Sequence, residues 1–156
     1  MSTRLPAPIP RGEIAELLRD HGIAPTHQRI EIASVLFSRR EHLSADQLLT
    51  IVNAHYSEVS KATVYNTLRL FLEKKLIREV IVDPSRVFYD PNTAPHHHFY
   101  NMASGELTDI RDDNLQLAAM PTLPAGTVAD SIDIIVRIRP GQSTLEASPH
   151  AGRAGA

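Results

Sequence analysis

The chain of 156 residues contains no cysteine and no tryptophan. Without cysteine it forms no disulfide, no iron–sulfur cluster and none of the thiolate zinc sites that hold many small folds together. The sequence also lacks an apolar run of the roughly 20 residues that a membrane-spanning helix needs, and residues 1–10 lack the apolar core of a signal peptide. From these absences we expect a cytoplasmic protein with no membrane-bound part.

An excess of one charge is also missing, because the formal net charge is -2. The basic composition that marks many nucleic-acid-binding proteins is therefore absent. Residues 1–90 carry 12 Lys or Arg against 11 Asp or Glu, a balance of +1, and residues 91–156 carry 4 against 7, a balance of -3. Any contact with a polyanion is expected in the first part. Hydrophobic residues make up 42% of the chain, which is enough for a folded core.

Histidine, by contrast, is concentrated at one point. Three of the eight histidines are consecutive, at positions 96, 97 and 98, and the others are scattered. Imidazole is the commonest protein ligand for transition metals and a frequent axial ligand of haem iron. Side chains alternate between the two faces of a strand. We therefore expect His96 and His98 to share one face, where they can bind one metal, and His97 to face the other way.

The sequence before residue 90 is dominated by amphipathic helical patterns. We expect four helices, over residues 13–21 and 27–38, from Ser44 onward, and over 61–75. The run from Ser44 to Gln47 fits a capping box, in which the first and fourth residues bond to each other's backbone amides. Two β-rich runs, 76–82 and 86–89, then predict a hairpin.

The helix over 61–75 presents a polar stripe opposite its apolar face. Lys61, Tyr65 and Arg69 are spaced four residues apart, and Asn66 lies beside them. Such a stripe is most often an ordinary solvated surface. Two helices joined by a short turn and followed directly by a hairpin are also typical of a winged helix-turn-helix that binds DNA. Both interpretations fit the pattern alone.

After residue 90 the pattern changes to strands. We expect strands over 96–101, 106–110 and 132–138, and a short helix over 112–119. Residues 91–95, with two prolines, form a predicted linker, and residues 140–156, rich in Gly, Ala, Ser and Pro, a predicted disordered tail. The predicted class is α+β, with a winged helix over 1–90 and a small α/β domain over 96–139.

Four blocks of the sequence together resemble the ferric uptake regulator (Fur) family over roughly residues 13–138. They are Gly22–Arg29, His42–Ala45, Ala62–Leu68 and the histidine triplet, in the family's order. The resemblance implies that residues 96–139 form a dimerisation and metal-sensing domain. It also implies a transcriptional repressor, not an enzyme, whose homodimer or tetramer binds a palindromic operator in double-stranded DNA.

Two departures point to one branch of the family. Asn101-Met102-Ala103-Ser104 stands where the family commonly has Cys-x-x-Cys, so the structural thiolate zinc site is absent, and Asn66 replaces the Arg that typically follows the recognition Tyr. With Val87–Asp90 and His96–Asn101, these features resemble the iron response regulator (Irr) branch. That resemblance implies control of iron and haem homeostasis genes, in several members through haem, and a partner protein in haem synthesis or delivery.

The resemblance also implies the roles of individual residues. The expected ligands of a regulatory Fe²⁺ or Mn²⁺, with Zn²⁺ as an alternative in vitro, are His42, Asp90, His96, His98 and Asp109. The candidate haem ligands are His96, His97 and His98. The expected DNA-contacting residues are Arg29, Lys61, Thr63, Tyr65, Asn66, Arg69 and Arg86. Taken singly, each of these residues also fits an ordinary surface or turn position.

Two other functions remain open at this stage. The spacing of three His and two Asp also resembles the peroxide-sensing branch of the family. A metalloenzyme with His and carboxylate ligands is the second alternative, because two His and one Asp match a facial triad in composition. Against it, the sequence contains no His-Glu-x-x-His motif, and five protein ligands would leave little room for a substrate.

Overall fold

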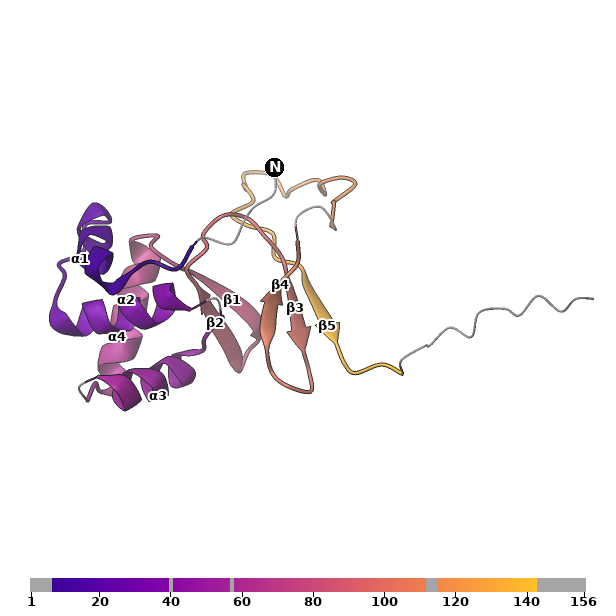
Figure 1. Cartoon of the computed structure of the whole chain (residues 1–156). Helices are drawn as coiled ribbons and strands as arrows, with labels where there is room; N and C mark the ends of the chain where they lie inside the picture. The colour runs from indigo at the N-terminus through magenta and orange to yellow at the C-terminus, as the bar shows by residue number, and fades with distance from the viewer. Residues whose placement is uncertain (1–6, 40, 57, 112–114, 143–156) are drawn as a thin grey trace, which may run out of the picture.

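The computed structural model describes residues 7–39, 41–56, 58–111 and 115–142. Four helices precede two small sheets that lie side by side (Figure 1). The helices are α1 (Arg11–Asp20), α2 (His27–Ser38), α3 (Ala45–His55) and α4 (Lys61–Glu73), and the strands are β1 (Arg78–Asp83), β2 (Arg86–Asp90), β3 (His98–Asn101), β4 (Leu107–Asp109) and β5 (Ile135–Ile138). The predicted α+β class, a winged helix-turn-helix followed by a smaller domain, is confirmed.

Local signals in the sequence fix where the helices begin. The Ser44 hydroxyl accepts the Gln47 amide at 3.2 Å, and the Gln47 side chain accepts the Ser44 amide at 2.9 Å, so the predicted capping box is present at the start of α3. Ser60 caps α4 in the same way, by accepting the Thr63 amide at 3.1 Å. These caps satisfy amides that a helix leaves unpaired at its first turn.

The four helices share one apolar core. Its fully buried members include Ile14, Leu18, Ile32, Leu48, Val52, Val64 and Phe71. Burial of a side chain such as Phe71 contributes about 1.5–3 kcal/mol. This core holds α3 and α4 as a rigid pair, and it leaves the opposite face of α4 in solvent, where Tyr65 is 40% exposed.

The hairpin predicted after α4 is present, but its first strand begins two residues later than expected. Lys75 adopts a left-handed conformation with φ 57, and Leu76 and Ile77 then turn back into the helical core, so β1 starts only at Arg78. Strands β1 and β2 pair antiparallel. This hairpin is the wing of the winged helix.

The inner face of the wing packs on the C-terminal sheet. Val80 and Phe88 of the hairpin form a second apolar cluster with Tyr100 of β3 and Leu107 of β4. Arg86 of the wing donates a hydrogen bond to the Tyr100 hydroxyl. Hydrophobic contacts therefore hold the hairpin against the sheet that follows it in the sequence.

The C-terminal sheet has the strand order β4-β3-β5. Strand β3 pairs antiparallel with β4 and parallel with β5. All three strands lie within the predicted ranges, although β3 begins at His98 and β5 at Ile135. Among the described residues, no helix is long and apolar enough to cross a membrane.

The short helix predicted over 112–119 is wrong for the residues that the structure describes. Residues 112–114 lie outside the described ranges, and residues 115–119 are not helical. A short helix needs an apolar face buried against a neighbour, and Leu117 is instead 49% exposed. Of the predicted tail, residues 143–156 also lie outside the described ranges.

Side-chain hydrogen bonds hold the turn between β3 and β4. The side-chain oxygen of Asn101 accepts the amides of Ala103 at 2.9 Å and Ser104 at 3.2 Å. Gly105 completes the turn with φ 74, a conformation that favours glycine. The residues that replace the family's thiolates therefore close this hairpin through an Asx turn.

We expect replacement of Ser44 by Ala to lower the free energy of unfolding by about 1 kcal/mol, because the Gln47 amide loses its cap. Urea denaturation followed by circular dichroism measures the change. The matched variant Ser44→Asn keeps a capping oxygen and should stay close to wild type. Equal loss in both variants would show that the hydroxyl is not acting as a cap.

Candidate metal centre

Five side chains from distant parts of the sequence converge between the helices and the C-terminal sheet. They are the five predicted ligands His42, Asp90, His96, His98 and Asp109, and one ligand atom from each lies within 4.8 Å of all the others. The structure thus brings together the whole predicted set. That these residues bind a metal stays a prediction.

Two strand pairings place these residues. The Tyr89 amide donates to the Leu43 carbonyl at 2.8 Å, which sets His42 beside Asp90 at the end of β2. In the β3–β4 ladder His98 lies directly opposite Asp109, and cross-strand partners have adjacent side chains. His96 precedes β3 by two residues and points to the same side as His98. His96 and His98 therefore meet in one cluster, as predicted, although the strand itself begins only at His98.

Each carboxylate contacts all three imidazoles. Asp90 Oδ2 lies 2.7 Å from the Nε2 atom of His96 and 3.2 Å from those of His42 and His98. Asp109 Oδ1 lies 2.8 Å from His42 Nε2, 3.3 Å from His98 Nε2 and 3.4 Å from His96 Nε2.

This spacing fits a single divalent ion. Ligand atoms bound at about 2.0–2.2 Å from one ion lie about 3 Å from their neighbours, which is the separation of the six nitrogen–oxygen pairs. Imidazole together with carboxylate suits Fe²⁺, Mn²⁺ and Zn²⁺. The donor set and its size are therefore those of a transition-metal site.

The cluster is buried and charged. His98 is 0% exposed, Asp90 1% and His96 4%. Burial disfavours the charged forms, but the hydrogen bonds to Asp109 and Asp90 outweigh it and raise the pKa of His42 to about 9 and that of His96 to about 10. Burial alone would raise the pKa values of Asp90 and Asp109. The hydrogen bonds to the three imidazoles outweigh it and hold both pKa values well below their usual range. Protons on His42 and His96 thus supply positive charge that a metal ion would replace.

Neighbouring groups orient the ligands. The Nδ1 atom of His96 lies 2.6 Å from the Ala94 carbonyl, which directs Nε2 into the cluster, and the other oxygen of Asp90 accepts the Asn92 amide at 2.9 Å. Such outer contacts fix the orientation of metal ligands. Within the described residues, the Nδ1 atoms of His42 and His98 have no hydrogen-bond partner. Their Nε2 atoms are therefore the ones that face the carboxylates.

His97 does not belong to the cluster. Its Nδ1 atom instead accepts the backbone amide of Ile134, just before β5, at 3.0 Å. Burial lowers the pKa of its imidazole, although Asp133 acts in the opposite sense. Haem ligation by the triplet stays a prediction. At His96 and His98 a haem iron would have to displace Asp90 from both Nε2 atoms.

The predicted DNA contacts fall into two groups. On α4, Lys61, Tyr65, Asn66 and Arg69 are exposed, and Thr63 is half-buried with its hydroxyl 2.8 Å from that of Ser60. Away from α4, Arg29 donates to the Ala24 carbonyl at 3.1 Å and Arg86 to Tyr100. The first group is available to a ligand, and the two arginines are engaged within the chain. The DNA-binding roles themselves stay predictions.

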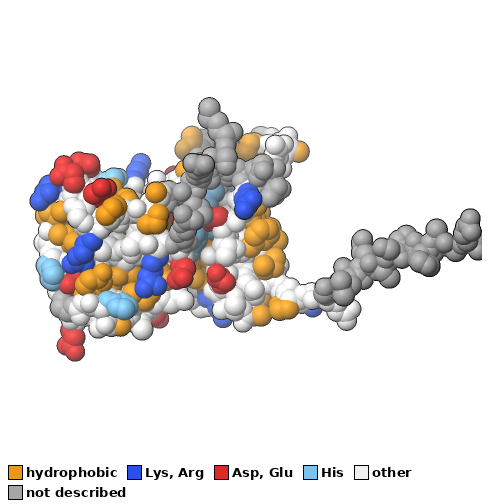
Figure 2. All heavy atoms as spheres, in the orientation of Figure 1, with side chains coloured by type: hydrophobic (Ala, Val, Ile, Leu, Met, Phe, Trp, Pro, Cys, Tyr) orange, Lys and Arg blue, Asp and Glu red, His pale blue; other side chains and the backbone are white. Residues whose placement is uncertain are grey.

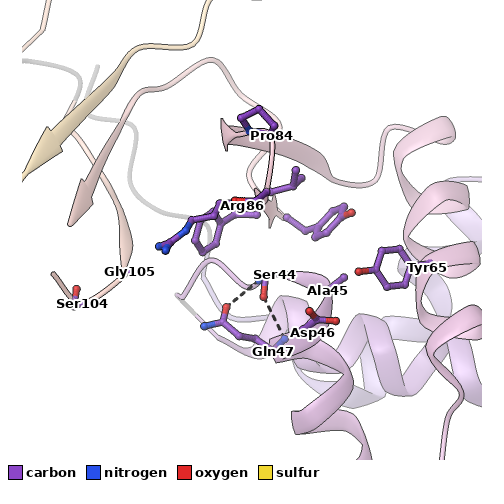
Figure 3. Close-up of a pocket in the computed structure, with 13 residues that line it drawn as sticks. Ser44, Ala45, Asp46, Gln47, Tyr65, Pro84, Arg86, Ser104 and Gly105 are labelled. Carbon is purple, nitrogen blue, oxygen red and sulfur yellow. Dashed lines mark hydrogen bonds between the residues drawn. The ribbon is translucent and has the colours of Figure 1, made fainter. Parts of the chain in front are cut away.

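A cavity of about 510 Å³, which sequence reasoning missed, lies beside this surface. Figure 3 shows it between the start of α3, Tyr65 of α4, the wing and the β3–β4 turn, with Arg86 extended toward Gly105. At its rim Asp46 lies 3.8 Å from the Lys61 ammonium. The carboxylate of Asp46 thus lies beside the polar stripe of α4. The sequence gave no signal for this contact, because Asp46 and Lys61 belong to different helices.

Comparison with known proteins identifies the family. Residues 20–125, more than half of the chain, match the model of the ferric uptake regulator family. The chain belongs to the ferric uptake regulator family. The "Peroxide operon regulator" of Bacillus subtilis is 32% identical over 114 residues, which cover 70% of this chain and 79% of that protein.

Further relatives agree with this membership of the ferric uptake regulator family. The "Peroxide-responsive repressor PerR" of Staphylococcus aureus (strain Mu50) is 32% identical over 94 residues, which cover 60% of this chain and 64% of that protein, a little under two thirds of its length. The crystal structure of the Vibrio cholerae ferric uptake regulator superposes with a TM-score of 0.63 at 20% identity, over 81% of this chain and 98% of that one. The structural match shows a shared fold. The family's branch is not decided by these matches.

We expect Mn²⁺ binding at pH 7 to release about two protons, one from His42 and one from His96, because metal ligation requires neutral imidazole. As pH rises toward 9–10 these protons are already lost, so the apparent affinity for Mn²⁺ should increase up to that range. Isothermal titration calorimetry in buffers of different ionisation enthalpy counts the protons. A release close to zero at pH 7 would contradict this protonation scheme.

We expect the two neighbours in the triplet to respond differently to substitution. Replacement of His96 by Ala should weaken Mn²⁺ binding by more than about 100-fold, because loss of an outer-shell contact alone costs up to about that much. His97→Asn keeps an acceptor for the Ile134 amide and should bind Mn²⁺ like wild type. Competition with a metal-binding dye measures both. Equal losses of Mn²⁺ affinity in the two variants would contradict the assignment of His96 as a ligand and His97 as a residue outside the site.

Proposed function

We propose that this chain is a metal-dependent transcriptional regulator whose homodimer binds a palindromic DNA operator, with Fe²⁺ or Mn²⁺ at the five-ligand centre. One observation carries the proposal. The ligands come from both parts of the fold, since His42 precedes α3 and Asp90 ends the wing, whereas His98 and Asp109 belong to the C-terminal sheet. A site built across this junction can control how the two parts are oriented.

The control follows from the charge of the site. A divalent ion supplies two positive charges that neutralise both carboxylates without any proton. His42, Asp90 and Asp109 would then all be ligands of the ion, which would hold His42 against the C-terminal sheet in place of the hydrogen bonds of the metal-free cluster. One orientation of α4 is thereby selected from those that the metal-free chain samples. In a dimer this orientation sets whether two recognition helices reach half-sites about 34 Å, or a multiple of that distance, apart.

The exposed face of α4 suits recognition of DNA. A helix fits the major groove, where Arg pairs with guanine, Asn pairs with adenine and an aromatic ring can pack against a thymine methyl group. Arg69, Asn66 and Tyr65 offer these three contacts on one side of α4. Lys61, at the start of α4, is placed to bind a phosphate.

The C-terminal sheet offers a surface for a second copy of the chain. Strand β5 is an outer strand, and its Val136 and Ile138 are 38% and 37% exposed. Figure 2 shows hydrophobic side chains at the surface of this part of the molecule. Exposed apolar residues and an unpaired strand edge favour association. A homodimer through β5 would bury both.

We propose iron and haem homeostasis genes as the targets and the cytoplasm, where such DNA lies, as the place of action. The support is the likeness to the Irr branch at Asn66 and at Asn101–Ser104. In this proposal haem opposes the metal, because its ligation by His96 or His98 breaks their bonds to Asp90 and releases the fixed orientation. Titration of haem into the operator complex should then lower DNA affinity. Unchanged binding would exclude haem control.

Peroxide sensing is the second candidate. It is supported by the set of three imidazoles and two carboxylates around one point and by the two relatives named as peroxide-responsive regulators. In this case peroxide treatment of the Fe²⁺ protein should add one oxygen atom to His42 or His96, which mass spectrometry detects. Reversible metal sensing leaves both imidazoles unmodified. Catalysis is disfavoured, because five protein ligands enclose the site.

We expect Mn²⁺ to raise the affinity for operator DNA by about 5- to 150-fold, the usual range of coupling between two sites. Fluorescence anisotropy with metal-free and Mn²⁺-loaded protein measures it, at one fixed salt concentration because phosphate contacts depend strongly on salt. His42→Ala should lose the response, since this ligand links the helical part to the sheet. A wild-type affinity that is equal with and without metal would refute metal control.

A further inference from the structure

His97 is the member of the triplet that the metal centre does not use. Its imidazole is half-buried and is bonded to a backbone amide outside the cluster. Its Nδ1 atom accepts the backbone N–H of Ile134 at 3.0 Å. Because an amide N–H can only donate, this Nδ1 carries no proton and the neutral ring is protonated at Nε2. His97 therefore has a defined partner on a different segment.

That partner lies at the start of the parallel ladder between β3 and β5. The His98 amide donates to the Ile134 carbonyl at 3.1 Å, so the two polar backbone groups of Ile134 bind two consecutive histidines. The His97 carbonyl also accepts the Ile110 amide at 2.8 Å, just after β4. Through backbone and side chain, His97 joins β3 to both of its neighbouring segments.

The residue before Ile134 is held from another direction. The carboxylate of Asp133 pairs with the guanidinium of Arg78 in β1, and Arg78 also donates to the Ala94 carbonyl at 3.5 Å. In the β1–β2 ladder Arg78 lies directly opposite Asp90. Residues 133–134, which lead into β5, are thus attached both to the strand that carries His98 and to the hairpin that carries Asp90.

From these contacts we infer that His97 is a positioning residue, which couples the metal centre to the dimer surface formed by β5. The inference rests on the proposed function, because it needs both a metal at the centre and a dimer through β5. Metal ligation of His96 and His98 would fix the backbone on both sides of His97. The imidazole would pass this constraint to Ile134, because closely packed strands transmit small changes in position.

Coupling of this kind is reciprocal, so metal binding strengthens the dimer by the same factor as dimerisation strengthens metal binding. The test compares wild type with His97→Leu, which cannot accept the Ile134 amide, and His97→Asn, whose side-chain oxygen can. Sedimentation equilibrium gives the dimer Kd of each, without metal and with saturating Mn²⁺. We expect Mn²⁺ to lower the wild-type Kd by about 10-fold or more, His97→Leu to reduce this to below about 3-fold, and His97→Asn to restore most of it.

Mn²⁺ affinity measured on the same samples keeps the two proposals apart. A wild-type chain that does not bind Mn²⁺ overturns the proposed function, and the coupling with it. A wild-type chain that binds Mn²⁺ while its dimer Kd stays constant overturns the coupling alone. The same holds if His97→Leu keeps the full wild-type shift, or if His97→Asn behaves like His97→Leu.

A measurement on the unaltered protein covers the case in which His97→Leu does not fold. Hydrogen exchange with mass spectrometry follows the peptide that contains Ile134, with and without Mn²⁺. Because the amide bonded to His97 is held more firmly when the metal fixes the triplet, its exchange should become slower in the loaded protein. An exchange rate that Mn²⁺ leaves unchanged would overturn the inference.

Discussion

Two carboxylates, one of them fully buried, packed among three imidazoles are the constraint on which this structure depends. Asp90 is 1% exposed and cannot be solvated, so its charge must be balanced by groups inside the fold. His42, His96 and His98 provide that balance, and they come from opposite sides of the junction between the helices and the C-terminal sheet. Removal of one of these imidazoles would leave a buried charge without its partner, which costs several kcal/mol. The charge cluster therefore joins the two parts of the chain as well as offering a site for metal.

The wing gives this junction its second attachment. Val80 and Phe88 share an apolar cluster with Tyr100 and Leu107, and Arg137 of β5 donates to the Val82 carbonyl at 2.8 Å. The domain boundary that the sequence suggests at residue 90 lies at the end of the β1–β2 hairpin. The hairpin before it and the C-terminal sheet after it pack together.

In this chain without cysteine, hydrogen bonds hold the turn between β3 and β4. In the turn between β3 and β4, the Asn101 side chain bonds two successive amides, and Arg86 reaches the same region by binding Tyr100. Hydrogen bonds of this kind depend on the strands that flank the turn, whereas a thiolate zinc site can hold a turn by itself. The stability of the sheet is therefore tied to the wing and to the proposed dimer surface at β5.

The sequence by itself determined the elements whose signals are local. The capping box at Ser44 marks the start of α3, and the pairing of His96 with His98 follows from their spacing of two residues, because both depend on residues a few positions apart. His42 and Asp109 could be named as ligands only through the family resemblance, since nothing near them in the sequence signals a metal.

Tertiary structure alone decided the geometry of the site. The Leu43–Tyr89 bridge and the His98–Asp109 pairing set the distances in the cluster, and the contact of Arg78 with Asp133 joins residues whose local sequence patterns are unrelated. It also decided against a helix at residues 115–119, whose apolar Leu117 finds no surface to pack on in the part of the chain that the structure describes. Strand register and burial arise from long-range packing, which local residue patterns do not encode.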